Sequence, residues 1–177
     1  MTRTTVQFLW REPGAVEGFR MAVSLHSHTM HSREGLGFVP RYASCVPILS
    51  WEFERQTRRY EISQGKLPDF SAAYWTSPLP SREAFEVERK QIEDGLGLSG
   101  IVSLTDHDNI DAGCQLQVLQ REIPVSVEWT IPFEETFFHL GLHNLPLQAA
   151  RDLMAALASY TQRPDAKLLQ ELLCGLV

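Results

Sequence analysis

The chain has 177 residues, of which 44% are hydrophobic and 21% charged, and its formal net charge is −6. This length and composition predict one globular domain with a core of its own, and the acidic balance argues against a general nucleic-acid or membrane-surface binder, which would carry a basic face. The three cysteines are scattered without CxxC spacing, and no signal-peptide core or long apolar run is present, so we expect a cytoplasmic protein with no disulfide framework and no membrane partner.

The first half of the chain predicts a hairpin, a helix and a loop. Residues 6–10 and 19–25 are apolar enough to form two strands of an N-terminal hairpin around the turn Glu12-Pro-Gly14. Residues 46–65 have the spacing of an amphipathic helix, and residues 66–80, with three prolines, predict an extended loop. We therefore interpret residues 46–80 as a helix and loop inserted into the single domain.

Strands and helices alternate in the second half. Ser81-Arg-Glu-Ala predicts a helix start, because serine can cap free backbone amides and Glu83 favours the positive end of the helix, and Gly95 should end it. Further strands are expected over residues 101–104, 125–127 and 137–142, and further helices over residues 111–121, 146–160 and 164–173. This alternation predicts an α/β fold with a largely parallel sheet.

All six histidines fall in three short segments, each near the end of a predicted strand. In α/β folds, the carboxyl ends of the strands form the edge where active sites lie. His26 and His28 are an i, i+2 pair, and an extended strand projects such residues from one face, so both rings can reach one ion. Alone the pair is weak evidence for a metal site, because the alternative of two surface or core histidines is common.

Acidic residues accompany the later histidines. Asp106 could orient the ring of His107 by accepting its second N–H. The alternative is that Asp108 or Asp111 simply caps the next helix, which would leave His107 unexplained.

Two further positions carry the same ambiguity when each is taken alone. Glu128 follows an apolar strand, and a buried carboxylate there is costly unless a cation or strong donors meet it; an ordinary strand-end charge is the alternative. His139 lies in an apolar run, where a satisfied core histidine is the usual interpretation. Because all these clusters share the same end of predicted strands, their joint pattern favours one polynuclear metal site.

Four motifs occur in the order LHSHTMHS, LTDHDNIDAG, VEWT and HLGLH, and over about residues 23–145 they resemble the PHP family, named for polymerase and histidinol phosphatase domains. Members are distorted (β/α)7 barrels that bind up to three divalent metals and mostly hydrolyse phosphate esters. The resemblance implies a metal-dependent phosphoesterase in which a metal-bridged hydroxide attacks phosphorus. It also implies two or three ions, for which zinc, manganese or iron would suit, and a small phosphorylated substrate or short nucleotide.

The resemblance also assigns roles to residues. His26 and His28 resemble the pair that holds the first metal, Glu128 the carboxylate that bridges the first and second, and His139 a ligand of the second. His107 resembles a ligand of the third, with Asp106 as its neighbour, and Glu34 stands where the family has a further third-metal ligand. The residues expected to carry catalysis are Glu128, His107 and Asp106.

Three residues are candidates to contact substrate: Arg33 and Arg41 could neutralise phosphate charge, and His143 could lie at the pocket rim. For the arginines, a solvated surface position is an equal alternative. His31 matches no fixed ligand of the family and is interpreted as a loop or rim residue.

The chain departs from the family pattern after His143, because no later histidine is present where the family has another ligand and a closing Asp-x-His. About four parallel strands plus the N-terminal hairpin are expected, which is an incomplete barrel. We expect self-association or a missing C-terminal segment to complete it. Two functions stay open: a phosphoesterase whose activity is in doubt, and a truncated, non-catalytic metal-binding or interaction module. Hydrolysis of a non-phosphate substrate on the same site is a third.

Overall fold

The computed structural model describes residues 13–134 and 136–176, which divide into two compact units. The first unit comprises the described residues up to Ser32 and those from Ser77 onward, and the second unit is Arg33–Thr76. The protein is mixed α/β, with six α-helices and short strands among the described residues. These strands form three two-stranded sheets and no closed barrel.

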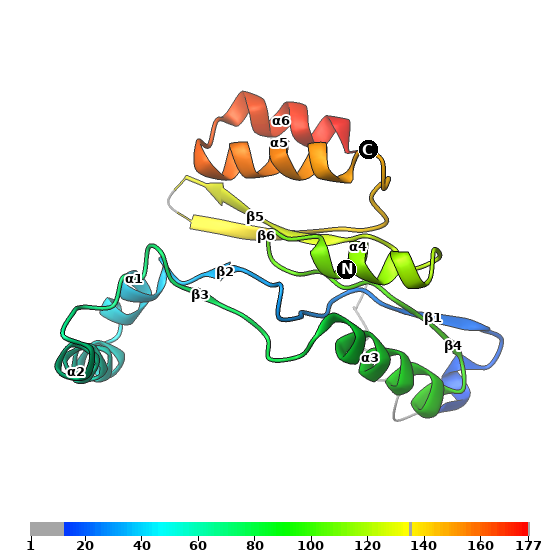
Figure 1. The fold of residues 1–177 in the computed structure, drawn as a ribbon, viewed down its shortest axis with the longest axis horizontal. Helices are drawn as coiled ribbons and strands as arrows, with labels where there is room; N and C mark the ends of the chain where they lie inside the picture. The colour runs from blue at the N-terminus through cyan, green and yellow to red at the C-terminus, as the bar shows by residue number, and fades with distance from the viewer. Residues whose placement is uncertain (1–12, 135, 177) are drawn as a thin grey trace, which may run out of the picture. The chain divides into compact units, whose positions relative to one another are not determined.

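A parallel strand pair begins the first unit (Figure 1). Strand β1 (Met21–Ser24) pairs with β4 (Ser99–Val102), in a register that runs from Met21 opposite Ser99 to Ser24 opposite Val102. The predicted second hairpin strand is thus confirmed as a strand, but the strand that it pairs with in the described residues is β4. Its expected partner, residues 6–10, lies outside the described residues, and Pro13–Val16 forms a short 3-10 helix.

Helix α3 (Ser81–Leu96) packs on this pair and confirms the helix predicted from Ser81. Its ends differ from the prediction. Pro80 occupies the N-cap position, and no side chain caps the helix. The helix continues through Gly95 and ends before Gly97, whose φ of 67° lies in the left-handed region that glycine adopts without strain. Two buried side chains of α3, those of Ala84 and Phe85, join a core that also contains Leu104 and Leu116.

The expected parallel sheet is wrong for the last two strands. Strands β5 (Val127–Phe133) and β6 (Thr136–Leu142) are antiparallel, with Val127 opposite Leu142 and Phe133 opposite Thr136. Two residues connect them, and a parallel pair would need a crossover of about a dozen residues or more.

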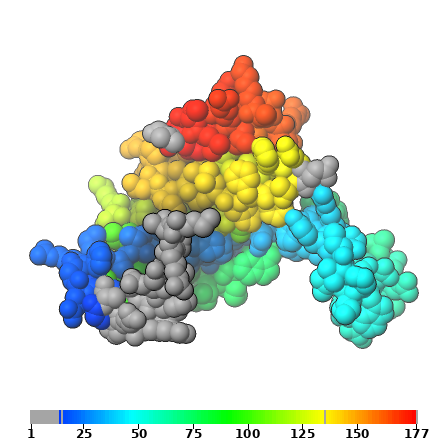
Figure 2. Space-filling model, turned by 180° about the vertical axis from the view of Figure 1, so that it is seen from behind, coloured from blue at the N-terminus to red at the C-terminus, as the bar shows by residue number. Residues whose placement is uncertain are grey.

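Two helices cover the β5–β6 hairpin, as the stacked yellow, orange and red side chains of Figure 2 show. Helices α5 (Ala150–Gln162) and α6 (Ala166–Gly175) confirm the two predicted C-terminal helices. The Tyr160 hydroxyl donates to the Pro132 carbonyl at 2.8 Å, and Trp129 is fully buried against the Tyr160 ring. Asp165 caps α6 by accepting the Leu168 amide at 2.9 Å.

Helix α4 (Asp111–Leu119) confirms the helix expected after the second histidine motif, but neither predicted aspartate caps it. The Asn109 side chain accepts the Asp111 amide at 2.7 Å, whereas Asp108 accepts the amide of Thr130 on β5 at 2.9 Å. Asp108 therefore joins the loop after β4 to β5, and it does so with a left-handed φ of 51°.

The second unit consists of helices α1 (Val39–Ser44) and α2 (Pro47–Gln64) and the short antiparallel pair β2 (Glu34–Gly35) and β3 (Tyr74–Trp75). Helix α2 confirms the helix predicted over residues 46–65, although none of its residues is buried. The loop predicted over residues 66–80 contains β3. The predicted insertion, residues 46–80, overlaps this unit, and a single domain over residues 1–177 stays a prediction.

None of the helices in the described residues is long and apolar enough to cross a membrane.

Candidate metal centre

The loops that follow β1 and β4 lie side by side and lead to the start of β5. The Thr105 amide donates to the Ser27 carbonyl at 2.8 Å, so the parallel pairing continues beyond both strands. His107 then forms a parallel bridge with Glu128. Residues from the two loops and from β5 therefore meet at one place in the first unit.

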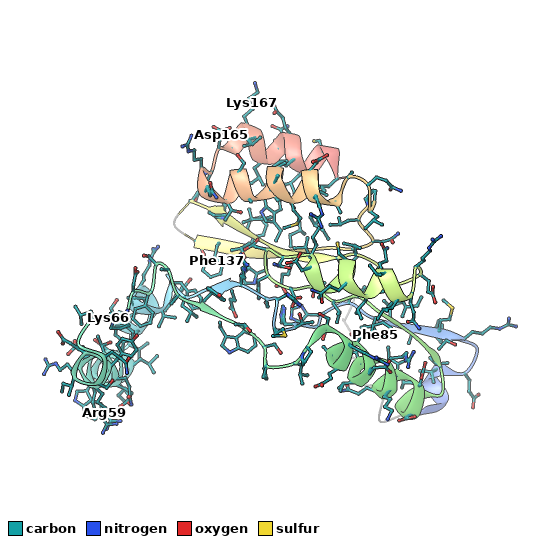
Figure 3. All side chains as sticks on the ribbon, in the orientation of Figure 1. Arg59, Lys66, Phe85, Phe137, Asp165 and Lys167 are labelled. Carbon is teal, nitrogen blue, oxygen red and sulfur yellow. The ribbon has the colours of Figure 1, made fainter. Side chains whose placement is uncertain are left out.

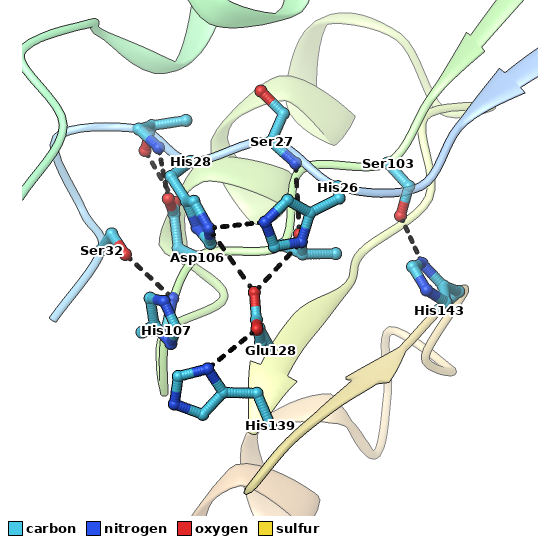
Figure 4. Close-up of polar contacts among 12 residues, drawn as sticks. His26, Ser27, His28, Ser32, Ser103, Asp106, His107, Glu128, His139 and His143 are labelled. Atoms are coloured by element: carbon cyan, nitrogen blue, oxygen red, sulfur yellow. Dashed lines mark hydrogen bonds and ion pairs between the residues drawn. The ribbon is translucent and has the colours of Figure 1, made fainter. Parts of the chain in front are cut away.

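Five side chains converge there (Figure 4), namely those of His26, His28, His107, Glu128 and His139. The Glu128 carboxylate lies among the rings: Oε2 is 3.2 Å from His26 Nδ1 and 3.5 Å from His28 Nε2, and Oε1 is 3.1 Å from His139 Nδ1. The His107 ring stacks on that of His28, with centroids 4.7 Å apart, and meets the His139 ring edge-on at 4.4 Å. The structure thus brings together five of the six predicted metal ligands.

Their positions on the strands correct one expectation. The histidines of the two loops do follow parallel strands, but Glu128 is the second residue of β5 and His139 lies within β6. Both had been expected at strand ends. Because β5 continues to Phe133 and β6 returns beside it, the antiparallel pairing places His139 opposite Thr130, next to the carboxylate.

Burial shapes the charges of this cluster. Glu128 is only 8% exposed, and its Oε2 has no hydrogen bond from the described residues although two imidazoles lie within ion-pair distance. Burial and the neighbouring rings of His139 and His28 lower the pKa of His107 to about 4. Burial, followed by the nearby His26 ring, also lowers the pKa of His28. Near neutral pH the rings of His28 and His107 are therefore neutral, and each can offer a nitrogen lone pair to a metal ion. Together with the Glu128 carboxylate they form a set of donor atoms that suits a cation.

The spacing of the donor atoms also fits a metal ion. With bonds of about 2.0–2.1 Å, the ligand atoms of a tetrahedral zinc site lie about 3.3 Å apart. Two groups of three residues could hold an ion, His26 with His28 and Glu128, and His107 with Glu128 and His139. His26 faces His28 through Nε2 at 3.1 Å and Glu128 through Nδ1, so an ion would use one of its two nitrogens. Glu128 belongs to both groups.

Asp106 holds the loop after β1, which carries His26 and His28, through hydrogen bonds to Thr29. Its two carboxylate oxygens accept the Thr29 amide and the Thr29 hydroxyl, the latter at 2.6 Å. Burial raises the pKa of Asp106, and the two hydrogen bonds from Thr29 oppose that rise. The Ser32 hydroxyl accepts the His107 amide at 3.1 Å. Sequence reasoning placed Asp106 at the His107 ring and missed the buried Thr29 and Ser32, because nothing local marks a partner more than 70 positions away.

His143 lies apart from the five side chains (Figure 4). Its Nδ1 is 2.7 Å from the Ser103 hydroxyl, which donates to the Ser126 hydroxyl at 2.8 Å. Burial lowers the pKa of His143. The backbone amide of His31 donates to the Thr29 hydroxyl at 3.2 Å. Neither histidine belongs to the two candidate metal groups.

Glu34, Arg33 and Arg41 belong to the second unit, where Glu34 pairs with Trp75 across β2 and β3. Their assignments to a third metal and to the substrate stay predictions.

The chain matches no protein-family model, no curated protein and no solved structure in comparisons with each. The PHP resemblance therefore remains a prediction from the four motifs, and the metal centre is inferred from the geometry of the five side chains.

The lowered pKa of His107 predicts how stability depends on pH in metal-free protein. The unfolded chain takes up the His107 proton below about pH 6.5 and the folded chain only near pH 4, so the free energy of unfolding should fall as the pH falls across this window. The contribution lost is about 3 kcal/mol. Urea denaturation in the presence of chelator at several pH values measures it.

The control for this prediction is His107→Gln, which removes the titrating ring. Burial raises the pKa values of Asp106 and Asp108, which stabilises the fold as the pH falls and partly offsets the effect of His107. The difference between the wild type and His107→Gln isolates the imidazole. Equal pH dependence in the two proteins would contradict a His107 pKa lowered by burial.

Proposed function

We propose that the protein is a metal-dependent hydrolase of phosphate esters whose centre holds two divalent ions that share Glu128. The observation that supports this most strongly is the position of the carboxylate. Its Oε2 faces His26 and His28, and its Oε1 faces His139, so the two oxygens lie toward different sets of imidazoles. Paired metal ions of this kind are typical of phosphatases and nucleases.

The number of ligands favours catalysis over a purely structural role. Each candidate group offers three protein ligands, as catalytic zinc sites do, whereas structural sites use four. When bound, the ions would supply a nucleophilic hydroxide near neutral pH and draw charge from the phosphoryl oxygens. Glu128 would fix the separation of the ions, and the neutral rings of His28 and His107 would hold them without adding charge. Mixed imidazole and carboxylate donors suit zinc, manganese or iron.

The same proposal includes the class of substrate, the type of barrel and a third metal ion. A small phosphorylated substrate or short nucleotide would bring negative charge, and Arg33 and Arg41 are the candidates to meet it. The parallel pair β1–β4, which the His107–Glu128 bridge extends to β5, would be part of a PHP-type barrel. A third metal held with Glu34 would complete the family pattern.

Metal analysis and a hydrolysis assay test the proposal together. Purified protein loaded with manganese or zinc should retain two ions per chain, as counted by mass spectrometry of the metal. It should hydrolyse a generic aryl phosphate, and His26→Ala should lower the turnover by a factor on the order of 100, because one ion loses a ligand. Lys167→Ala, at an exposed residue of α6, is the matched control and should keep full turnover.

The outcomes separate the candidate functions. Bound metal without turnover would favour the non-catalytic metal-binding module. Turnover of a carboxylic ester or amide, with none of the phosphate, would favour the non-phosphate hydrolase. Protein that holds no ion would contradict both hydrolases and the metal-binding module, and would favour a non-catalytic interaction module.

A further inference from the structure

Helix α2 presents a stripe of three large apolar side chains and two arginines that its own unit leaves exposed. At about 100° per residue, positions 48, 51, 55, 58 and 62 lie on one face of a helix, with the alternating spacing of three and four residues found in paired helices. We call Ile48, Trp51, Arg55, Arg58 and Ile62 the α2 stripe. Ile48 is 77% exposed, Trp51 64% and Ile62 85%, which places its two isoleucines among the most exposed large apolar side chains described.

The opposite face of α2 already has a partner within the second unit. Phe53 packs against Phe70 of the following loop, with ring centroids 5.2 Å apart. Together with Tyr60 and Pro68 they line a cavity of about 620 Å³. Figure 3 looks along α2 and shows its side chains radiating on all sides. The helix is therefore held in its unit by one face, and the α2 stripe lies on the other.

We propose that the α2 stripe is the contact surface for a second copy of this chain, bound as an antiparallel pair of α2 helices. With the two-fold axis at Arg55, Ile48 of one copy lies opposite Ile62 of the second copy, and the same contact recurs by symmetry. Trp51 lies opposite Arg58 of the second copy, a pairing that a cation–π contact favours. Both ends of the stripe thus bury isoleucine against isoleucine.

An antiparallel pair gives Glu52 and Arg59, which flank the α2 stripe, complementary partners on the second copy. Glu52 and Arg59 flank the α2 stripe on the same side, and an antiparallel pair places Glu52 of each copy opposite Arg59 of the other. In a parallel pair each flank of the stripe would face the opposite flank of the partner, so Glu54 rather than Glu52 would lie beside Arg59. The central Arg55 does not meet its symmetry mate as a bare charge, because its guanidinium donates to the Glu52 carboxylate at 2.7 and 2.8 Å and lies over the Trp51 ring.

A single-stranded nucleic acid is the alternative occupant, since arginines and Trp51 line a hollow on this face. The charges favour the second copy. Residues 33–76 carry six basic and five acidic side chains, and Glu54 lines the same hollow. A nucleic-acid surface would instead be basic throughout.

Sedimentation of the full chain over a wide range of concentrations tests the proposal. Because the proposed dimer does not depend on the metal centre, the same experiment in the presence of chelator should give the same result. We expect a monomer–dimer equilibrium, and Ile62→Glu should raise the dissociation constant about tenfold or more, because it places a charge at two symmetric apolar contacts. The matched control is Val118→Glu, an 84% exposed apolar residue of α4, which should leave the equilibrium unchanged.

A charge exchange tests the direction of the helices. Glu52→Arg and Arg59→Glu should each weaken the dimer several-fold, and the double variant should restore it, with folding of each checked by circular dichroism. A monomer at every concentration would overturn the proposal, as would a dimer that Ile62→Glu leaves intact. Salt-dependent binding of a single-stranded DNA oligonucleotide by a monomeric chain would overturn it in favour of the nucleic-acid alternative.

Discussion

Glu128→Gln is expected to weaken the binding of both metal ions strongly, because this carboxylate is the residue that the two candidate groups share. An amide keeps the shape of the side chain but loses the charge and offers one oxygen in place of two. We expect the affinity for each ion to fall by a factor on the order of 100 or more. Titration calorimetry of zinc or manganese into chelator-stripped protein measures the loss directly.

The same variant should behave differently without metal. Glu128 is a buried charge whose Oε2 has no hydrogen bond from the described residues, so its removal should leave the free energy of unfolding of metal-free protein unchanged or higher. Metal at 100 times its dissociation constant should stabilise the wild type by about 2.7 kcal/mol for each bound ion, and Glu128→Gln hardly at all. Glu171→Gln, at an exposed carboxylate on α6, is the control. If metal stabilises Glu128→Gln as much as it stabilises Glu171→Gln, Glu128 is not a ligand that the two ions share.

Asp106→Ala is expected to destabilise the protein by roughly 2–4 kcal/mol, even without metal. It leaves the Thr29 amide and the Thr29 hydroxyl, both completely buried, without their acceptor. The loop that carries His26 and His28 should then lose its fixed position, and the affinity for metal should fall as a consequence. Chemical denaturation with chelator, followed by metal titration, separates the two effects.

Thr29→Val is the partner variant for this prediction. It removes the hydrogen bond from the Thr29 hydroxyl to Asp106 and keeps the one from the Thr29 amide, so it should lower the free energy of unfolding by less than Asp106→Ala does. The double variant should lose less stability than the sum of the two single variants, because both substitutions act on one interaction. If Asp106→Ala instead lowers turnover without lowering stability, Asp106 is a catalytic residue, as the sequence resemblance implied, and its role as a loop anchor is wrong.

The helices were the part of the fold that local pattern could predict. Helices α2 and α3 follow from apolar periodicity and turn residues, which act within a few positions. Strand pairing depends on contacts between distant segments, and alternation alone suggested a parallel sheet where β5 and β6 form a hairpin. The short connection between them was the local sign that could have corrected this expectation.

In the candidate site, too, local pattern could be predicted from the sequence and contacts between distant segments could not. Histidines that share strand ends could be grouped from the sequence because parallel strands bring such ends to one edge, and this reasoning found the positions of His28 and His107. It could not find Thr29 or Ser32, since small hydroxyl residues carry no sign of a distant partner. It also placed the Asp106 carboxylate at the His107 ring, whereas the structure places it at Thr29. An acid next to a histidine in sequence need not point to that histidine in space.

Anomalous diffraction from crystals grown with zinc or manganese, recorded at the absorption edge of the metal, tests the shared centre most directly. We expect two peaks within bonding distance of Glu128, one beside His26 and His28 and the other beside His107 and His139. Peaks located elsewhere, or a Glu128 carboxylate with no metal bound to it, would contradict the metal centre and the function proposed from it.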